Sequence, residues 1–252
     1  MSKSRPDWKN YERLVAQLVA QQLFNEYCVT PNARVAGTIS GRNRQIDVLI
    51  DFRHDTDNSR RIIIDAKARS RRIDVTHVEA FLGLMADVGA THGYLVCPLG
   101  HTEAAQRRAQ DAVSIRLLPL DRLENFDPST WPDCLVEKCR GGKVFWSGYP
   151  SVDMHVRPSV GKLNEMRRIS FVHYVGKCDR CHQFHVQCME CRDIFSTPYD
   201  SDDDGHRCRC GMPWFWLASL ETDDVGRTSA ELHLVTALHG EVHVQTVDRR
   251  SM

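Results

Sequence analysis

Two short apolar runs on either side of a wholly polar loop constrain the fold of this chain more than any other feature. The runs span residues 46–52 and 62–66 and are rich in β-branched side chains, and the loop 53–61 between them contains no apolar residue. Apolar runs joined in this way predict the two antiparallel strands of a hairpin. We place the turn of this hairpin near residues 56–57.

Three of the charged residues within or just after these apolar runs, Asp47, Asp65 and Lys67, are expected to come together. In the expected register Asp47 lies opposite residue 66, beside Asp65 and Lys67, and the last two are two positions apart and share one strand face. Burying an ionised carboxylate costs several kcal/mol unless it is paired or binds a cation. An Asp–Lys ion pair on a half-exposed sheet is the simplest explanation, but the additional Asp47 and the hairpin frame favour a Mg²⁺ site.

The order of these residues resembles the Mrr-like type IV restriction endonucleases of the PD-(D/E)xK superfamily. The resemblance is carried by Gly41-x-x-Arg-Gln-Ile-Asp-Val and by an apolar strand that ends in Asp65-x-Lys67. It continues over roughly residues 8–123. Many relatives have Glu or Gln where Asp65 stands, and this departure bears on the preferred metal more than on activity.

The resemblance also implies a role for each site residue. Asp47 and Asp65 would bind the catalytic Mg²⁺ together with the carbonyl group of Ala66. Lys67 would position the attacking water or offset charge at the phosphorus. Glu12 falls on or beside the buried stripe of the first predicted helix, and the family pattern implies that it joins the site.

The pattern of elements around the hairpin predicts an α/β nuclease domain over residues 1–125. Helices and strands that alternate imply right-handed crossovers and parallel pairing, whereas the hairpin adds antiparallel pairing. We therefore expect a restriction-endonuclease-like mixed β-sheet flanked by helices. The expected helices begin after Asp7, Asp74 and Thr102, and further strands are expected at 35–39, 94–97 and 115–118.

Basic residues cluster near the predicted metal site, although the whole chain is balanced at 33 basic and 33 acidic residues. A solvated surface explains many charge runs, but arginines beside a metal site suit phosphate contacts. Such contacts supply affinity without sequence information. We expect DNA-backbone contacts from Arg42, Arg44, Arg69, Arg71 and Arg72.

The expected function is hydrolysis of DNA phosphodiester bonds by a metal-dependent endodeoxyribonuclease in restriction or defence. A rival hypothesis is a catalytically silent nucleic-acid-binding or sensing protein on the same fold, because fold alone does not determine function. The intact set of Asp47, Asp65 and Lys67 argues against this rival. RNA as the substrate lacks support, since no aromatic stacking motif is present. The oligomeric state, a homodimer included, stays open.

Six cysteines in the second half of the chain have metal-ligand spacing. A Cys-x2-Cys turn places two thiolates on one tight knuckle, which suits tetrahedral Zn²⁺. The six residues are Cys178, Cys181, Cys188, Cys191, Cys208 and Cys210. The last four have zinc-ribbon separation and are our first choice for one structural zinc ion.

The remaining pair, Cys178 and Cys181, needs partners. Candidate partners are His182, His185 and His206, and a set of Cys178, Cys181, Cys208 and Cys210 also stays open. Cys134 and Cys139 have no recognisable metal-ligand spacing. We expect a small β-rich zinc-ribbon domain over residues 171–252, joined to the nuclease domain by a β-rich connecting region over 126–170.

Cysteine usage and hydropathy indicate the compartment. No apolar stretch approaches the roughly 18–20 residues of a membrane span, and the N-terminus has no apolar signal core. Ten cysteines without a signal sequence favour a reducing, cytoplasmic setting and metal ligation over disulfides. We therefore expect a cytoplasmic protein without a membrane partner.

Overall fold

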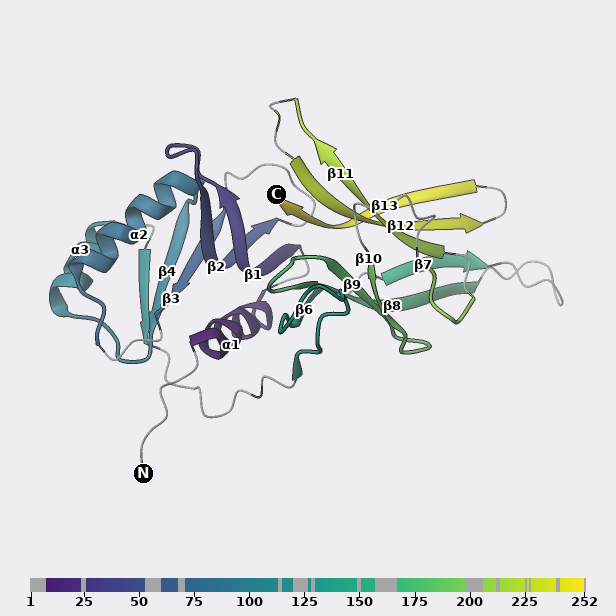
Figure 1. Cartoon of the computed structure of the whole chain (residues 1–252), viewed down its shortest axis with the longest axis horizontal. Helices are drawn as coiled ribbons and strands as arrows, with labels where there is room; N and C mark the ends of the chain where they lie inside the picture. The colour runs from purple at the N-terminus through teal and green to yellow at the C-terminus, as the bar shows by residue number, and fades with distance from the viewer. Residues whose placement is uncertain are drawn as a thin grey trace. The chain divides into compact units, whose positions relative to one another are not determined.

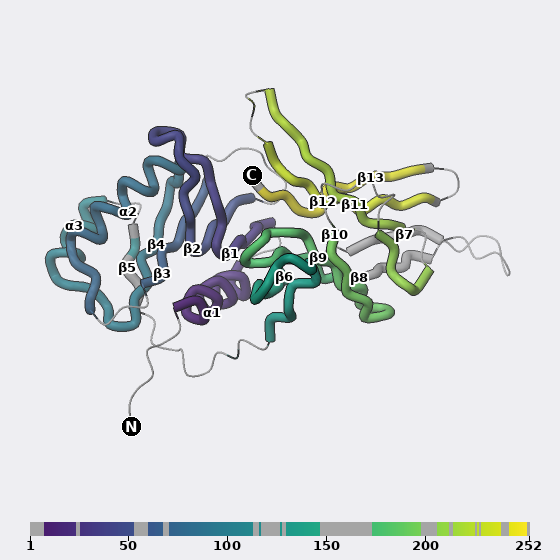
Figure 2. Tube along the Cα trace, in the orientation of Figure 1, coloured from purple at the N-terminus to yellow at the C-terminus, as the bar shows by residue number. Residues whose placement is uncertain are grey.

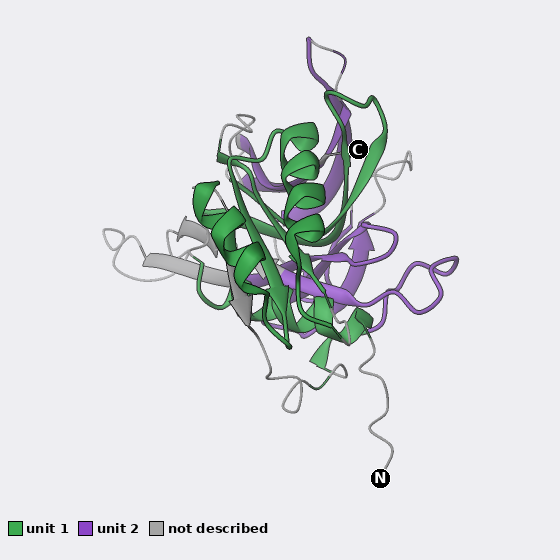
Figure 3. Ribbon diagram, turned by 90° about the vertical axis from the view of Figure 1, so that its left-hand side faces the viewer, with its two compact units in different colours: residues 1–132, 251–252 green, residues 133–250 purple. Residues whose placement is uncertain are grey.

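The structure, a computed structural model of the whole chain, contains two compact units, residues 1–132 with 251–252 and residues 133–250 (Figure 3). Within the described part of the chain, we find no helix that is both long and apolar enough to cross a membrane. The described residues are 8–23, 26–52, 60–67, 71–112, 115–119, 127, 130–148, 151–156, 167–197, 206–211, 214–224, 226, 228–238 and 241–251.

The first unit is built on a five-stranded sheet of order β1-β2-β3-β4-β5 with helices packed against it (Figure 1). β1, β2 and β3 pair antiparallel, whereas β3, β4 and β5 pair parallel. The expected mixed α/β sheet is thereby confirmed. Its elements are α1 (Trp8–Ala20), β1 (Tyr27–Ala36), β2 (Asn43–Phe52), β3 (Ile62–Ala66), α2 (Val75–Val88), β4 (His92–Cys97), α3 (Glu103–Asp111) and β5 (Ile115–Pro119).

Helix α2 shows how the sequence specifies this unit. The side chain of Asp74 accepts a hydrogen bond from the backbone N–H of His77 at the start of the helix, and Gly89 ends it with a φ of 68°. Between these caps, Phe81 and other apolar residues of α2 pack into the main core. A Cβ atom on Gly93 would lie 2.5 Å from the Phe81 ring, so the glycine permits the close approach of α2 to β4.

The register of the β2–β3 hairpin differs by one residue from the expected one. Val48 pairs with Ile64 and Ile50 with Ile62, so continuation of this register places Asp47 opposite Asp65 rather than residue 66. The physical reason is an ion pair across the hairpin. Arg61 binds Asp51 at 3.0 Å, and continuation of the observed register sets these two residues opposite each other. The centre of the polar loop, from which we placed the turn, does not reveal this pairing.

The second unit is almost entirely β-structure. One sheet has the order β10-β9-β8-β6, β7 also pairs with β8, and β11-β12-β13 form a separate sheet (Figure 2). β8 runs across residue 170, where we expected the zinc-ribbon domain to begin. The strands are β6 (Val144–Gly148), β7 (Ser151–Val156), β8 (Arg167–Cys178), β9 (Phe184–Cys188), β10 (Ile194–Thr197), β11 (Trp214–Thr222), β12 (Thr228–Leu238) and β13 (Glu241–Ser251).

A compact apolar cluster joins the strands of this unit. Trp214 and Trp216 of β11 are almost fully buried against Leu232 and Leu234 of β12, and Val175 and Phe184 extend the cluster to β8 and β9. The Cys-x2-Cys turns, one between β8 and β9 and one between β9 and β10, lie outside this cluster. The apolar core therefore leaves those turns to be held by other interactions.

Candidate active site and metal centres

Four side chains from α1, β2 and the end of β3 form one charged cluster in the first unit. The Lys67 Nζ atom lies 2.6 Å from Asp65 Oδ1, and the backbone N–H of Ala66 donates to Asp47 Oδ2 at 2.8 Å. Glu12 is close enough to interact electrostatically with Asp47, Asp65 and Lys67. The structure thus brings together all four residues that the sequence selected.

This cluster contains more carboxyl groups than basic groups, and the pKa values of two of the carboxyl groups are raised. Burial, followed by the charge of Asp65, raises the pKa of Asp47 to about 7. Burial and the charges of Asp47 and Asp65 raise the pKa of Glu12 to about 8, although Lys67 opposes this shift. Three carboxylates around one ammonium group repel one another, and a divalent cation relieves that repulsion. The hard oxygen donors present suit Mg²⁺.

The local sequence explains why these polar groups stay partly buried. On α1 the neighbours Tyr11, Leu14 and Val15 are buried, so Glu12 lies beside the apolar stripe and is half-buried. On β3, Asp65 continues a strand of three isoleucines, and the backbone N–H of Lys67 donates to the carbonyl of Val96 on β4. The charged groups are therefore held by elements whose other side chains build the core.

Residues 4–126 match the family model of the Mrr catalytic domain, which is described as a restriction endonuclease. These residues belong to the Mrr-like restriction endonuclease family. The match includes Glu12, Asp47, Asp65 and Lys67, and the family is one of nucleases that act on DNA. No curated protein and no solved structure matches the chain.

The arginines expected to contact DNA fall into two groups on the Mrr-like domain. Arg42, Arg71 and Arg72 are exposed. Arg44 instead forms an ion pair with Asp87 at 3.5 Å, and Asp87 also accepts hydrogen bonds from Ser40. Arg44 therefore takes part in holding the turn before β2. Arg69 lies outside the described residues.

Eight cysteines of the second unit form two groups of four. In each group, the four sulfur atoms lie within 4.8 Å of one another. One group contains our first choice of zinc ligands, Cys188, Cys191, Cys208 and Cys210. The other is Cys134, Cys139, Cys178 and Cys181.

The group expected from the sequence joins the β9–β10 turn to the segment before β11. The sulfur atoms of Cys188 and Cys210 are 3.8 Å apart. An ion pair of 3.0 Å between Asp193 and Arg209 links the two segments next to the cysteines. Although burial opposes it, the backbone N–H of Asp193 and the neighbouring Cys188 thiol lower the pKa of the Cys191 thiol, whereas burial raises the pKa of the Cys188 thiol.

The partners of Cys178 and Cys181 differ from those we considered. Among the described residues, the structure gives this pair Cys134 and Cys139 rather than a histidine or the Cys208–Cys210 pair. The ring of His185 is instead engaged with the backbone. A sequence signal for the missed pair is a glycine soon after it. Gly141 stands two residues after Cys139 and Gly211 stands directly after Cys210, and their φ values are 72° and 67°.

Proposed function

We propose that this protein is a Mg²⁺-dependent endodeoxyribonuclease that hydrolyses DNA phosphodiester bonds in restriction or a related defence. The observation that carries the proposal is the convergence of Glu12, Asp47, Asp65 and Lys67 within a domain of the Mrr-like family. A lone Asp–Lys ion pair would not require two further carboxylates beside it. Their mutual repulsion is the expected property of a site that binds a divalent cation.

Asp47 and Asp65 would hold Mg²⁺, together with the backbone carbonyl of Ala66. When bound, the ion would stabilise charge on the phosphoryl oxygens and lower the pKa of a bound water. The carboxylate of Asp65 orients the ammonium group of Lys67, which positions the attacking water or offsets charge at the phosphorus. Glu12 completes the negative site, in the inner or outer shell of the ion.

The DNA backbone would be held by exposed arginines that flank the site residues in the sequence. Arg71 and Arg72 follow β3 by a few residues, and Arg42 precedes β2. Guanidinium groups on the surface can neutralise phosphates without reading the bases. The second unit would then serve recognition of DNA or of a partner rather than chemistry.

A structural zinc ion in the second unit is part of the same proposal. Its ligands would be the thiolates of Cys188, Cys191, Cys208 and Cys210, which meet from two turns. Four protein ligands and no open position are typical of structural rather than catalytic zinc. In this proposal the first unit binds a catalytic metal through oxygen ligands, and the second unit binds a structural metal through sulfur ligands.

The deciding experiment is cleavage of modified and unmodified plasmid DNA by the purified full chain, with Mg²⁺ or with EDTA. We expect nicking or linearisation only with Mg²⁺, and none by Asp47→Asn or Asp65→Ala. Asp111→Asn is the matched control because Asp111 is exposed on α3, and its cleavage should equal that of wild type. DNA binding without any Mg²⁺-dependent cleavage would favour the silent alternative. Wild-type cleavage by both site variants would refute the site assignment.

A further inference from the structure

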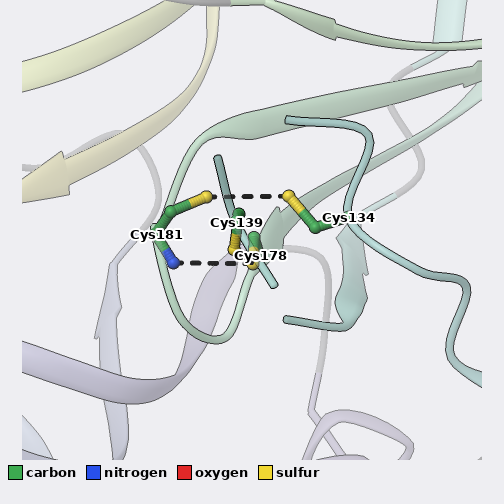
Figure 4. Close-up of side chains that lie close together, drawn as sticks. All are labelled: Cys134, Cys139, Cys178 and Cys181. Carbon is green, nitrogen blue, oxygen red and sulfur yellow. Dashed lines mark hydrogen bonds between the residues drawn. The ribbon is translucent and has the colours of Figure 1, made fainter. Parts of the chain in front are cut away.

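Two segments far apart in the sequence bring four cysteines together at one end of β9 (Figure 4). Cys134 and Cys139 precede β6, whereas Cys178 and Cys181 lie at the turn between β8 and β9. The sulfur atoms of Cys134 and Cys181 are 3.6 Å apart, and those of Cys139 and Cys178 are also 3.6 Å apart. Each of these two close pairs therefore joins one cysteine from the segment before β6 to one cysteine from the β8–β9 turn.

These separations match tetrahedral zinc better than disulfides. Zn–S bonds of about 2.3 Å in a tetrahedron put neighbouring sulfurs roughly 3.8 Å apart, close to the observed distances. A disulfide would need about 2.05 Å, and all four residues are free thiols.

The knuckle at Cys178 repeats the knuckle at Cys188, ten residues later in the sequence. The backbone N–H of Cys178 donates to the carbonyl of Gln183, as that of Cys188 does to Asp193. The residues after the second cysteines, His182 and Arg192, have φ values of 60° and 61°. Two turns with the same backbone geometry and the same cysteine spacing are expected to bind the same kind of ligand.

The backbone around Cys178 is also arranged for a thiolate. The N–H groups of Arg180 and Cys181 point at the Cys178 sulfur at 3.3 and 3.5 Å, and the N–H of Val136 points at the Cys134 sulfur at 3.4 Å. Several N–H groups aimed at sulfur stabilise negative charge on it. Gly142 lies against the cluster, where a Cβ atom would be 2.5 Å from the Cys178 sulfur and 2.7 Å from the Cys139 sulfur.

Hydrogen bonds hold the two segments in place beside the sulfurs. Lys143 donates its N–H to the Asp179 carboxylate at 2.8 Å, and Asp179 returns its own N–H to the Lys143 carbonyl at 2.9 Å. The buried His185 ring accepts from the N–H of Leu135 through Nε2. With that acceptor role, Nδ1 carries the proton and donates to the carbonyl of Gln183. His185 is therefore a support for the cluster and not a ligand.

We propose that Cys134, Cys139, Cys178 and Cys181 bind a second structural Zn²⁺ ion. The chain then carries one zinc ion at each end of β9, and the second ion joins the segment before β6 to the β8–β9 turn. This inference goes beyond the proposed nuclease function and does not depend on it.

The test uses the full chain, purified without chelator. Its zinc content is measured by mass spectrometry. We expect two zinc ions per chain in wild type and one in Cys134→Ser/Cys139→Ser. The variant Cys188→Ser/Cys191→Ser should also lose one. The matched control is Cys28→Ala/Cys97→Ala, which removes two buried thiols of the first unit and should keep both ions. One zinc ion in wild type, or two in Cys134→Ser/Cys139→Ser, would overturn the proposal.

A second measurement on the wild-type chain avoids reliance on variants that fail to fold. Alkylation of the native protein should leave Cys134, Cys139, Cys178 and Cys181 unmodified until zinc is removed, after which all four should react. Alkylation of these four before zinc removal, or an intact mass that shows them joined as disulfides, would refute the site. Gly142→Ala should weaken zinc retention, whereas Gly83→Ala, with open space around it, should not.

Discussion

The two units of this protein place their candidate metal ligands in opposite ways. In the first unit, Glu12, Asp47 and Asp65 sit beside a sheet whose core, around Phe81 and Leu95, is closed by apolar contacts. In the second unit, the two cysteine groups occupy turns outside the apolar cluster of Trp214 and Trp216. The proposed oxygen ligands lie beside a core that apolar contacts close without them, whereas the proposed sulfur ligands occupy turns outside the apolar cluster of their unit. A catalytic metal and a structural metal should therefore respond differently to the same kind of mutation.

Removal of a zinc ligand should have the largest effect and should stay within the second unit. Structural zinc contributes on the order of 10–16 kcal/mol in finger peptides near neutral pH. In Cys208→Ser we expect backbone amides of the β9–β10 region to lose hydrogen-exchange protection. Amides of β2 and β3 should keep theirs, and some less selective DNA cleavage should persist. Unchanged exchange throughout the second unit would contradict the role we give to zinc.

Removal of Lys67 should have the opposite profile, with lost activity and a retained fold. We expect Lys67→Ala to reduce Mg²⁺-dependent cleavage by about 10²–10³-fold, the cost of one preorganised charge at a reacting centre. DNA affinity and zinc content should be close to wild type. Lys138→Ala is the control, because Lys138 is exposed on the second unit. A variant at Lys67 that cleaves DNA at the wild-type rate would show that the ion pair with Asp65 is only structural.

Charge reversal at Arg71 and Arg72 should weaken DNA binding without touching either metal. Each lost phosphate contact should reduce the slope of log affinity against log salt by about 0.9, so we expect a change near 1.8 for Arg71→Glu/Arg72→Glu. The loss should be similar on all DNA sequences. Arg107→Glu, on a residue ion-paired within α3, provides the comparison. A salt dependence that is flat in wild type would point to a protein partner instead.

The smallest expected effect is the cost of the carboxylate cluster to the stability of the Mg²⁺-free nuclease unit. The pKa of Glu12 is raised to about 8 in the folded state, above its ordinary value near 4.3. The folded state thus holds a proton that the unfolded state has lost, and stability falls as pH rises from about 5 to 8. Glu12→Gln should flatten this dependence by on the order of 1 kcal/mol after solvent screening. Urea denaturation at both pH values measures it, and an equal slope in the variant would contradict the assigned cause.

Much of the nuclease unit could be predicted because its signals are local. Asp74 and Thr102 cap α2 and α3 as expected, and an Asp and a Lys two positions apart at a strand end must lie close together. The role of Arg44 was harder to predict from the sequence. Only its ion pair with Asp87, more than forty residues away, shows that Arg44 holds a turn. A run of arginines looks the same in sequence whether its members face solvent or a buried carboxylate.

The sequence by itself determined the family, through the order of motifs over residues 4–126. It also determined the closeness of Asp65 to Lys67 and the Cys-x2-Cys turns, because these depend on spacing within a few residues. Only the tertiary structure decided the hairpin register and the partners of Cys178 and Cys181. Val144 pairs with Cys178 in the β6–β8 ladder, and this pairing carries Cys134 and Cys139 to the β8–β9 turn. Spacing along the chain sets the geometry of a single turn, but the choice between distant turns is made by strand pairing and packing.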